Sequence, residues 1–182
     1  MERSPQQVYC ELLVMRCQSG ERDAFTKLVE LWQTRLLGQA MQLCEDRQLA
    51  LDVLQDSWLA IARGLHALQD PASFPSWSYR IVRNKAADAI RFRMRERRQL
   101  SGDEPTDQLS RAGSGSTELD ELRLAIRGLP PDSRELLRLY YFDGLTIADI
   151  SRILEIPAGT VKSRLSAARK KLRELMQGAD ND

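Results

Sequence analysis

The chain has 182 residues, of which 42% are hydrophobic, 6% aromatic and 29% charged, and its net charge is only +1 at pH 7. No apolar run approaches the roughly 20 residues of a membrane span, and the first residues lack a signal-peptide pattern, so we expect a soluble cytoplasmic protein. The scarcity of β-branched runs favours a helical protein of one domain or two small ones.

Four helices are predicted in the N-terminal part, because apolar residues recur there at spacings of three and four. The predicted spans are 6–18, 23–43, 48–64 and 76–98. The last helix starts with an apolar stripe and ends in a densely basic half. The stripe consists of Trp77, Ile81, Ala87 and Ile90.

Residues 99–118 are rich in Gly, Ser, Asp and Thr and show no apolar period. This composition predicts a flexible acidic linker between two domains, residues 1–98 and 119–182.

Beyond this linker, the sequence predicts a helix in "ELDELRLAIRGL" and, after a Pro-Pro pair, another in "DSRELLRLYYF". Thr146, followed three residues later by Asp149, is a helix N-cap pattern and opens a short helix that ends near Leu154. Pro157 suits the first turn of a final helix over 158–173.

The near-neutral total hides a strongly uneven charge distribution. Residues 76–98 carry a net +6 and residues 157–182 a net +3, whereas residues 99–121 carry −5. Separate basic patches are typical of proteins that contact a phosphate backbone. The alternative for either patch alone is an ordinary solvated helix face.

The final helix has the pattern of a DNA-reading helix. On a helical wheel, Val161, Leu165, Ala168 and Leu172 form one stripe, and small polar residues flanked by cations lie opposite. Short side chains allow close approach to base edges, and flanking Lys and Arg reach phosphates or guanines. With the preceding short helix this predicts a helix-turn-helix, the alternative being a plain amphipathic helical hairpin. The candidate DNA-binding residues are Gly159, Thr160, Lys162, Ser163, Arg164, Ser166, Arg169 and Lys170.

Three stretches together resemble a known family. "LPPDSRELLRLYYFDGLTIADISRILEIPAGTVKSRLSAARKKL" resembles the promoter-binding C-terminal domain of extracytoplasmic-function sigma factors of bacterial RNA polymerase. "LALDVLQDSWLAIARGL" resembles their polymerase-docking helix, and "FPSWSYRIVRNKAADAIRFRMRER" resembles their helix that reads the −10 promoter element. The resemblance covers residues 10–98 and 119–176 in the family's order. It implies an all-α fold with a region 2-like domain and a region 4-like domain, the latter reading the −35 element.

The resemblance also implies roles for residues in the N-terminal domain. The polymerase-binding residues it implies are Asp52, Gln55 and Asp56, together with Trp58, for which a place in the core is the alternative. Asn84 is implied to line a pocket for a flipped base. The other implied −10 residues are Trp77, Tyr79, Arg80, Arg83, Lys85 and Arg91.

Three of these residues have structural alternatives, because Trp77 and Tyr79 could be core residues and Arg80 could pair with Asp88. The chain departs from the family at Ser78, usually a bulky aliphatic residue, and at Leu68, often Phe. The sequence therefore leaves the −10 preference open.

The family reading implies a binding subunit with core RNA polymerase and promoter DNA as partners, without catalytic residues, cofactor, metal, small-molecule substrate or direct membrane insertion. The rival interpretations are a stand-alone helix-turn-helix regulator, with residues 1–98 as a sensor or dimerisation domain, and a DNA-processing enzyme such as a recombinase. Cys10, Cys17 and Cys44 are interpreted as buried free thiols, with a redox or zinc role as the alternative. An anti-sigma partner, the promoters read and the inducing signal are left open.

Overall fold

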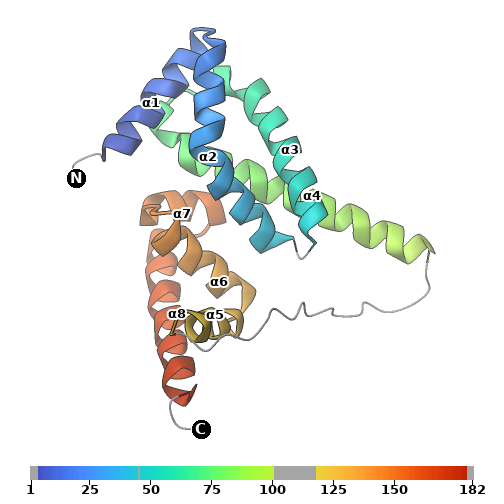
Figure 1. The fold of residues 1–182 in the computed structure, drawn as a ribbon, viewed down its shortest axis with the longest axis vertical. Coiled ribbons are helices and arrows are strands. Elements are labelled where there is room, and N and C mark those ends of the chain that lie inside the picture. The colour runs from blue at the N-terminus through green and yellow to red at the C-terminus, as the bar shows by residue number, and fades with distance from the viewer. Residues whose placement is uncertain (1–3, 45, 101–117, 180–182) are drawn as a thin grey trace. The chain divides into compact units, whose positions relative to one another are not determined.

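The computed structural model describes residues 4–44, 46–100 and 118–179, and the described residues are helical with short connections and no strand (Figure 1). The all-α prediction is therefore confirmed for this part of the chain. The elements are α1 (Pro5–Gln18), α2 (Arg22–Leu43), α3 (Arg47–Gly64), the 3₁₀ turns η1 (Leu65–Ala67) and η2 (Pro71–Ser73), α4 (Phe74–Leu100), α5 (Glu118–Arg127), α6 (Pro131–Leu137), the π-helical η3 (Arg138–Phe142), α7 (Ile147–Leu154) and α8 (Ala158–Ala179).

The helices group into two compact units, and the first of them extends to Glu96 in α4. The predicted linker, 99–118, lies almost entirely outside the described residues. None of the helices in the described ranges combines the length and the apolar content of a membrane-spanning segment.

An aromatic cluster forms the centre of the N-terminal unit. The Trp32 ring meets Phe74 and Tyr79 edge to face, with centroid distances of 5.7 and 6.3 Å, and its indole Nε1 donates a hydrogen bond to Cys10 Sγ at 3.2 Å. Aliphatic side chains of α1, α2 and α3 also belong to the core of this unit; Leu13, Val14, Leu28, Leu36 and Ile61 are fully buried. Burial of these side chains drives the packing of the helices, because each large apolar side chain removed from water contributes about 1.5–3 kcal/mol to the stability of the fold.

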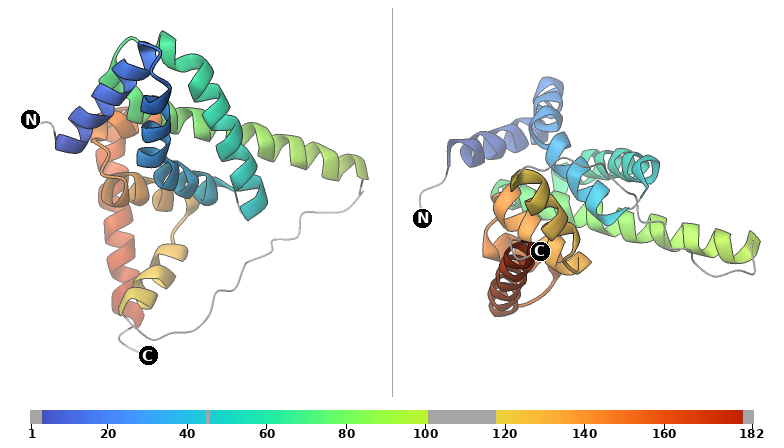
Figure 2. Two further views of the ribbon diagram at one scale, coloured as in Figure 1. Left: turned by 45° about the horizontal axis from the view of Figure 1, so that its top comes forward. Right: turned by 60° about the horizontal axis from the view of Figure 1, so that its bottom comes forward.

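The buried face of α4 differs from the predicted stripe. Ala87 is exposed and Ile90 only half-buried, whereas Tyr79, Val82 and Ala86 are buried. The buried stripe is therefore rotated relative to the predicted one, and Tyr79 in this stripe packs edge to face on Trp32. Beyond Ala89 the side chains of Phe92 and Met94 are exposed, and α4 extends past the other helices of its unit (Figures 1 and 2).

The C-terminal unit packs α5 and α6 against α8 (Figure 2). Its buried apolar residues include Leu136, Leu139, Ile150, Val161 and Leu165. The predicted helix over "DSRELLRLYYF" divides into α6 and η3, because the Asp143 N–H donates to the carbonyl of Arg138, five residues earlier, at 3.0 Å. The Asp143 carboxylate is buried and also accepts a hydrogen bond from Arg138 Nε at 3.3 Å.

The three cysteines are buried free thiols. Burial raises the pKa of Cys10 to about 11, although its hydrogen bond from Trp32 acts in the opposite direction. Within the described residues no three His, Cys, Asp or Glu side chains lie close enough to hold a metal ion.

Candidate nucleic-acid interface

The helix-turn-helix is formed by α7, α8 and the turn between them. Thr146 and Asp149 cap α7 reciprocally: the Asp149 N–H donates to Thr146 Oγ1 at 3.1 Å, and the Thr146 N–H donates to Asp149 Oδ2 at 3.2 Å. The predicted N-cap is therefore confirmed as a capping box.

The turn depends on a residue in left-handed backbone conformation, Glu155, with φ of 55°. This conformation reverses the chain so that the Ile156 N–H donates to the Ser151 carbonyl at 3.2 Å, while Ser151 Oγ donates to the Ile156 carbonyl at 2.6 Å. These two bonds fix the start of α8 relative to α7.

The buried stripe of α8 agrees with the wheel, since Val161, Leu165 and Ala168 are buried and Leu172 is half-buried. The candidate DNA-binding residues lie on the remaining surface. All of them are exposed except Thr160, which is half-buried; the exposed ones are Gly159, Lys162, Ser163, Arg164, Ser166, Arg169 and Lys170. A Cβ added at Gly159 would meet no atom within 4 Å, so the first turn of α8 is open to an approaching surface.

Two cations of α8 already have contacts within the helix. Arg169 Nε donates to the Leu165 carbonyl at 3.3 Å, and Lys171 Nζ lies 3.7 Å from Glu174 Oε2. Lys162 and Arg164, near the N-terminus of the helix, project from its exposed face. They are therefore better placed than Arg169 to contact bases.

The second basic surface is on α4. Arg80, Asn84 and Arg91 are exposed, and Arg83 and Lys85 are half-buried. The carboxylate of Asp88 pairs with Arg91 in this structure: Asp88 Oδ1 accepts a hydrogen bond from Arg91 Nη2 at 2.5 Å. The alternative pair of Arg80 with Asp88 is not observed among the described contacts.

Three side chains at the start of α4 face inward rather than outward. Tyr79 is fully buried, so its ring cannot reach DNA without a rearrangement of the core. Trp77 is half-buried, with its ring 6.1 Å from Phe74. Ser78 is fully buried and donates to the Pro75 carbonyl at 3.0 Å, so the departure from the family at this position alters the interior.

Helix α3 carries an exposed surface with acidic side chains. Asp52, Gln55 and Asp56 are exposed, whereas Trp58 is half-buried and meets Phe25 edge to face at 6.0 Å. A groove of about 800 Å³ separates the two helices, and the residues lining it are Asp56, Lys85, Asp88, Ala89, Arg91, Phe92 and Arg95.

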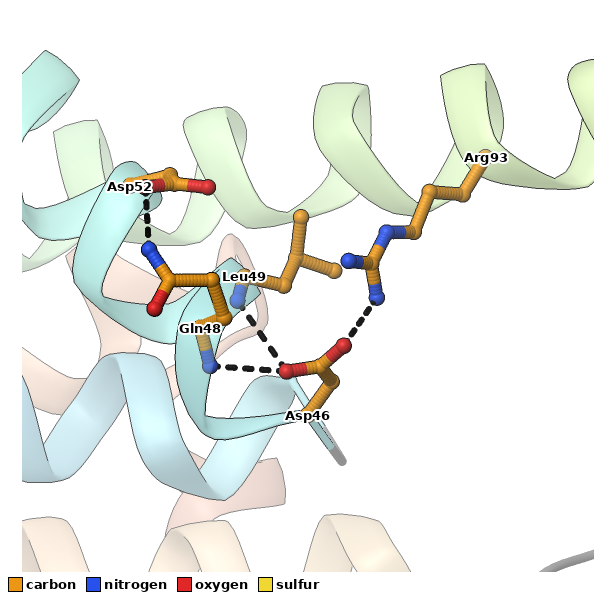
Figure 3. A network of polar contacts seen from close by, with 5 residues as sticks. All are labelled: Asp46, Gln48, Leu49, Asp52 and Arg93. Atoms are coloured by element: carbon orange, nitrogen blue, oxygen red, sulfur yellow. Dashed lines mark hydrogen bonds and ion pairs between the residues drawn. The ribbon is translucent and has the colours of Figure 1, made fainter.

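Sequence reasoning missed one pair that joins the two helices, Asp46 and Arg93. Asp46 is the N-cap of α3, and its Oδ2 lies 2.5 Å from Arg93 Nη1 of α4 (Figure 3). The guanidinium and the backbone N–H groups of Gln48 and Leu49 lower the pKa of Asp46 below its usual range. A capping Asp before the third helix was visible in the sequence, but nothing distinguished Arg93 from the other cations of α4.

A helix-turn-helix with an exposed, cation-flanked second helix, together with a second basic helix in a separate helical unit, defines a DNA-binding transcription protein. Comparison with known proteins gives the family. The family model "Sigma-70 region 2" matches residues 28–96, and "Sigma-70, region 4" matches residues 119–172.

The chain is 30% identical to the RNA polymerase sigma-H factor of Pseudomonas aeruginosa, over 91% of this chain and 92% of that protein. It is 27% identical to the ECF RNA polymerase sigma-E factor of Haemophilus influenzae, over 94% and 97% of the two chains. A solved structure of the sigma factor RpoE in complex with the anti-sigma factor NepR from Bartonella quintana matches with a TM-score of 0.67 and 27% identity, covering 84% of this chain and 96% of that one. The chain belongs to the extracytoplasmic-function sigma factors and is an alternative sigma factor of RNA polymerase.

Proposed function

We propose that this sigma factor selects promoters by contacting them at two points. Residues 119–182 bind the −35 element through α8, and residues 1–98 bind core polymerase through α3 and the −10 element through α4. Residues 99–118 join the two domains. The chain makes and breaks no covalent bond in this scheme, because polymerase supplies the chemistry.

The observation that carries the proposal is the exposed face of α8. Its buried stripe fixes the orientation of the helix, and its N-terminal half exposes only small residues with Lys162 and Arg164 beside them. A helix can lie deep in the major groove only with short side chains at the contact, and cations at its edges then reach phosphates or guanine.

On α4, we assign backbone contacts to Arg80, Arg83, Lys85 and Arg91 and base contacts to Asn84. An exposed amide both donates and accepts hydrogen bonds, so it can read the edge of an unpaired base. Trp77 would stack on the opened strand only after leaving Phe74. Tyr79 is omitted from this surface because it is buried.

On α3, we assign polymerase contacts to Asp52, Gln55 and Asp56, which share one side of the helix at spacings of three and four. The complex of a related sigma factor with an anti-sigma factor suggests that a protein of that kind also regulates this chain.

Reconstitution with purified core polymerase tests the proposal. The wild-type chain should co-elute with core and direct transcription from a promoter whose transcript rises on overexpression. The variant R164A should still co-elute with core but transcribe less. Binding of DNA by the chain alone, without co-elution with core polymerase, would instead support the stand-alone regulator.

A further inference from the structure

The two carboxylate oxygens of Asp46 have separate partners. Its Oδ1 accepts hydrogen bonds from the backbone N–H groups of Gln48, at 2.7 Å, and Leu49, at 3.3 Å, which caps α3. Its Oδ2 accepts a hydrogen bond from Arg93 Nη1 of α4 at 2.5 Å. Figure 3 shows this single side chain between the first turn of α3 and the basic half of α4.

The pair lies where α4 has few other anchors. Phe92 is 61% exposed and Met94 is 56% exposed, so the apolar side chains on either side of Arg93 contribute little packing. Phe92, Arg91 and Arg95 line an open groove rather than a packed contact. The orientation of this half of α4 therefore depends on polar contacts more than its first half does.

The same network continues to the side of α3 assigned to polymerase. Gln48, whose backbone N–H binds Asp46, donates its side-chain Nε2 to Asp52 Oδ1 at 3.2 Å. A continuous series of contacts thus joins Arg93 to Asp52 (Figure 3).

We propose that Asp46 is a positioning residue for promoter opening: by holding Arg93, it fixes the basic half of α4 at a set angle to the polymerase-facing side of α3. This role rests on the proposed function. Neither Asp46 nor Arg93 needs to touch DNA, because their effect is exerted through the placement of Lys85 and Arg91.

A competing model makes the opposite prediction. If Arg93 were itself a phosphate contact that Asp46 holds back, removal of the Asp46 charge would release a cation and strengthen binding to the −10 region. The positioning role predicts slower opening from the same substitution.

The substitution Asp46→Asn separates the two tasks of Asp46. Asn caps a helix about as well as Asp, so α3 should remain intact, whereas the ion pair to Arg93 is lost. Arg93→Gln removes the same pair from the other side and leaves the cap untouched. The matched control is Glu21→Gln, because Glu21 pairs with Arg16 at the same 2.5 Å and with similar exposure, and neither residue is among those assigned to polymerase or DNA.

The experiment measures promoter opening by full-length holoenzyme, using permanganate reactivity of unpaired thymines on a promoter whose start site is mapped. D46N and R93Q should each slow opening by about two- to fivefold, the range for a partly exposed ion pair. The double variant should be no slower than either single variant, and R93K should recover part of the rate. E21Q should match wild type, and all variants should co-elute with core.

Three results would each overturn the positioning role while leaving the proposed function intact. They are promoter opening at the wild-type rate by both D46N and R93Q, faster opening by D46N, and additive losses of rate in the double variant. Failure of the wild-type holoenzyme to open or transcribe the promoter would reject the proposed function itself.

Discussion

The contact between Gly64 and Trp77 allows a sharp test of the packing between α3 and α4. Gly64 is the last residue of α3, and a Cβ added there would lie 2.9 Å from Trp77 Cζ2 and 3.4 Å from Cη2. Trp77 also meets Phe74, which is fully buried and packed against Trp32. The rigid indole ring therefore cannot move away without disturbing the aromatic cluster.

The substitution Gly64→Ala should lower the free energy of unfolding. Overpacking of this kind costs about 1–3 kcal/mol. The preference of a helix for Ala over Gly offsets up to about 1 kcal/mol of that cost. We expect a net loss of roughly 1–2 kcal/mol, which corresponds to about 4–8 °C in melting temperature for each kcal/mol in a unit of this size.

Thermal and urea unfolding of the full chain, followed by circular dichroism and tryptophan fluorescence, measures this loss. Gly159→Ala is the matched control, because a Cβ at Gly159 meets no atom within 4 Å, and it should be neutral or slightly stabilising. In a Trp77→Phe background the loss caused by G64A should shrink, since Phe lacks the ring atoms that clash. A G64A variant as stable as wild type would refute the steric argument.

Three further outcomes are expected. Alanine at Arg164 or Lys162 should cost about 1–3 kcal/mol of binding free energy at the cognate −35 site and relax specificity, whereas Arg169→Ala should weaken binding to all DNA sites similarly. Filter or fluorescence binding measures these losses. Equal losses at every site for all three variants would remove the base-reading assignment. Burial raises the pKa of Cys10 from 9.0 to about 11, so the folded state favours the neutral thiol. The resulting stabilisation is complete below pH 9, and about 2–3 kcal/mol of the free energy of unfolding should be lost as the pH rises towards 11. A Cys10→Ala variant with the same alkaline loss of stability would contradict this expectation. Glu155→Gly should raise the free energy of unfolding by up to about 1 kcal/mol, because a non-glycine residue at φ of 55° is strained. A lower melting temperature in thermal unfolding would show that the strain is absent.

The sequence by itself determined the helices and the recognition helix. Helix periods and caps are local, so the spans of α2, α3 and α7 and the Thr146–Asp149 capping box follow from neighbouring residues. The buried stripe of α8 was equally readable, because its apolar residues recur every three or four positions against a polar opposite face. The family resemblance was visible for the same reason, since it rests on contiguous motifs.

Only the tertiary structure decided which side chains of α4 face the core. An aromatic residue at a helix start can be a surface wedge or a buried ring. The periodicity of α4 placed Trp77 in the apolar stripe, whereas the structure buries Tyr79 completely and Trp77 only in part. The Tyr79 ring packs edge to face on Trp32, and the side chain is completely buried. These contacts join residues of α2 and α4 and depend on how the helices cross.

The same limit applies to charge. The sequence predicted a basic half of α4, because net charge is a sum over neighbouring residues. It did not predict which of these cations would form an ion pair with a carboxylate of the protein. Asp46 and Arg93 are 47 residues apart and meet at 2.5 Å only because α3 starts beside that turn of α4. The chain alone thus determines where charge accumulates, and packing determines which charges remain available to DNA.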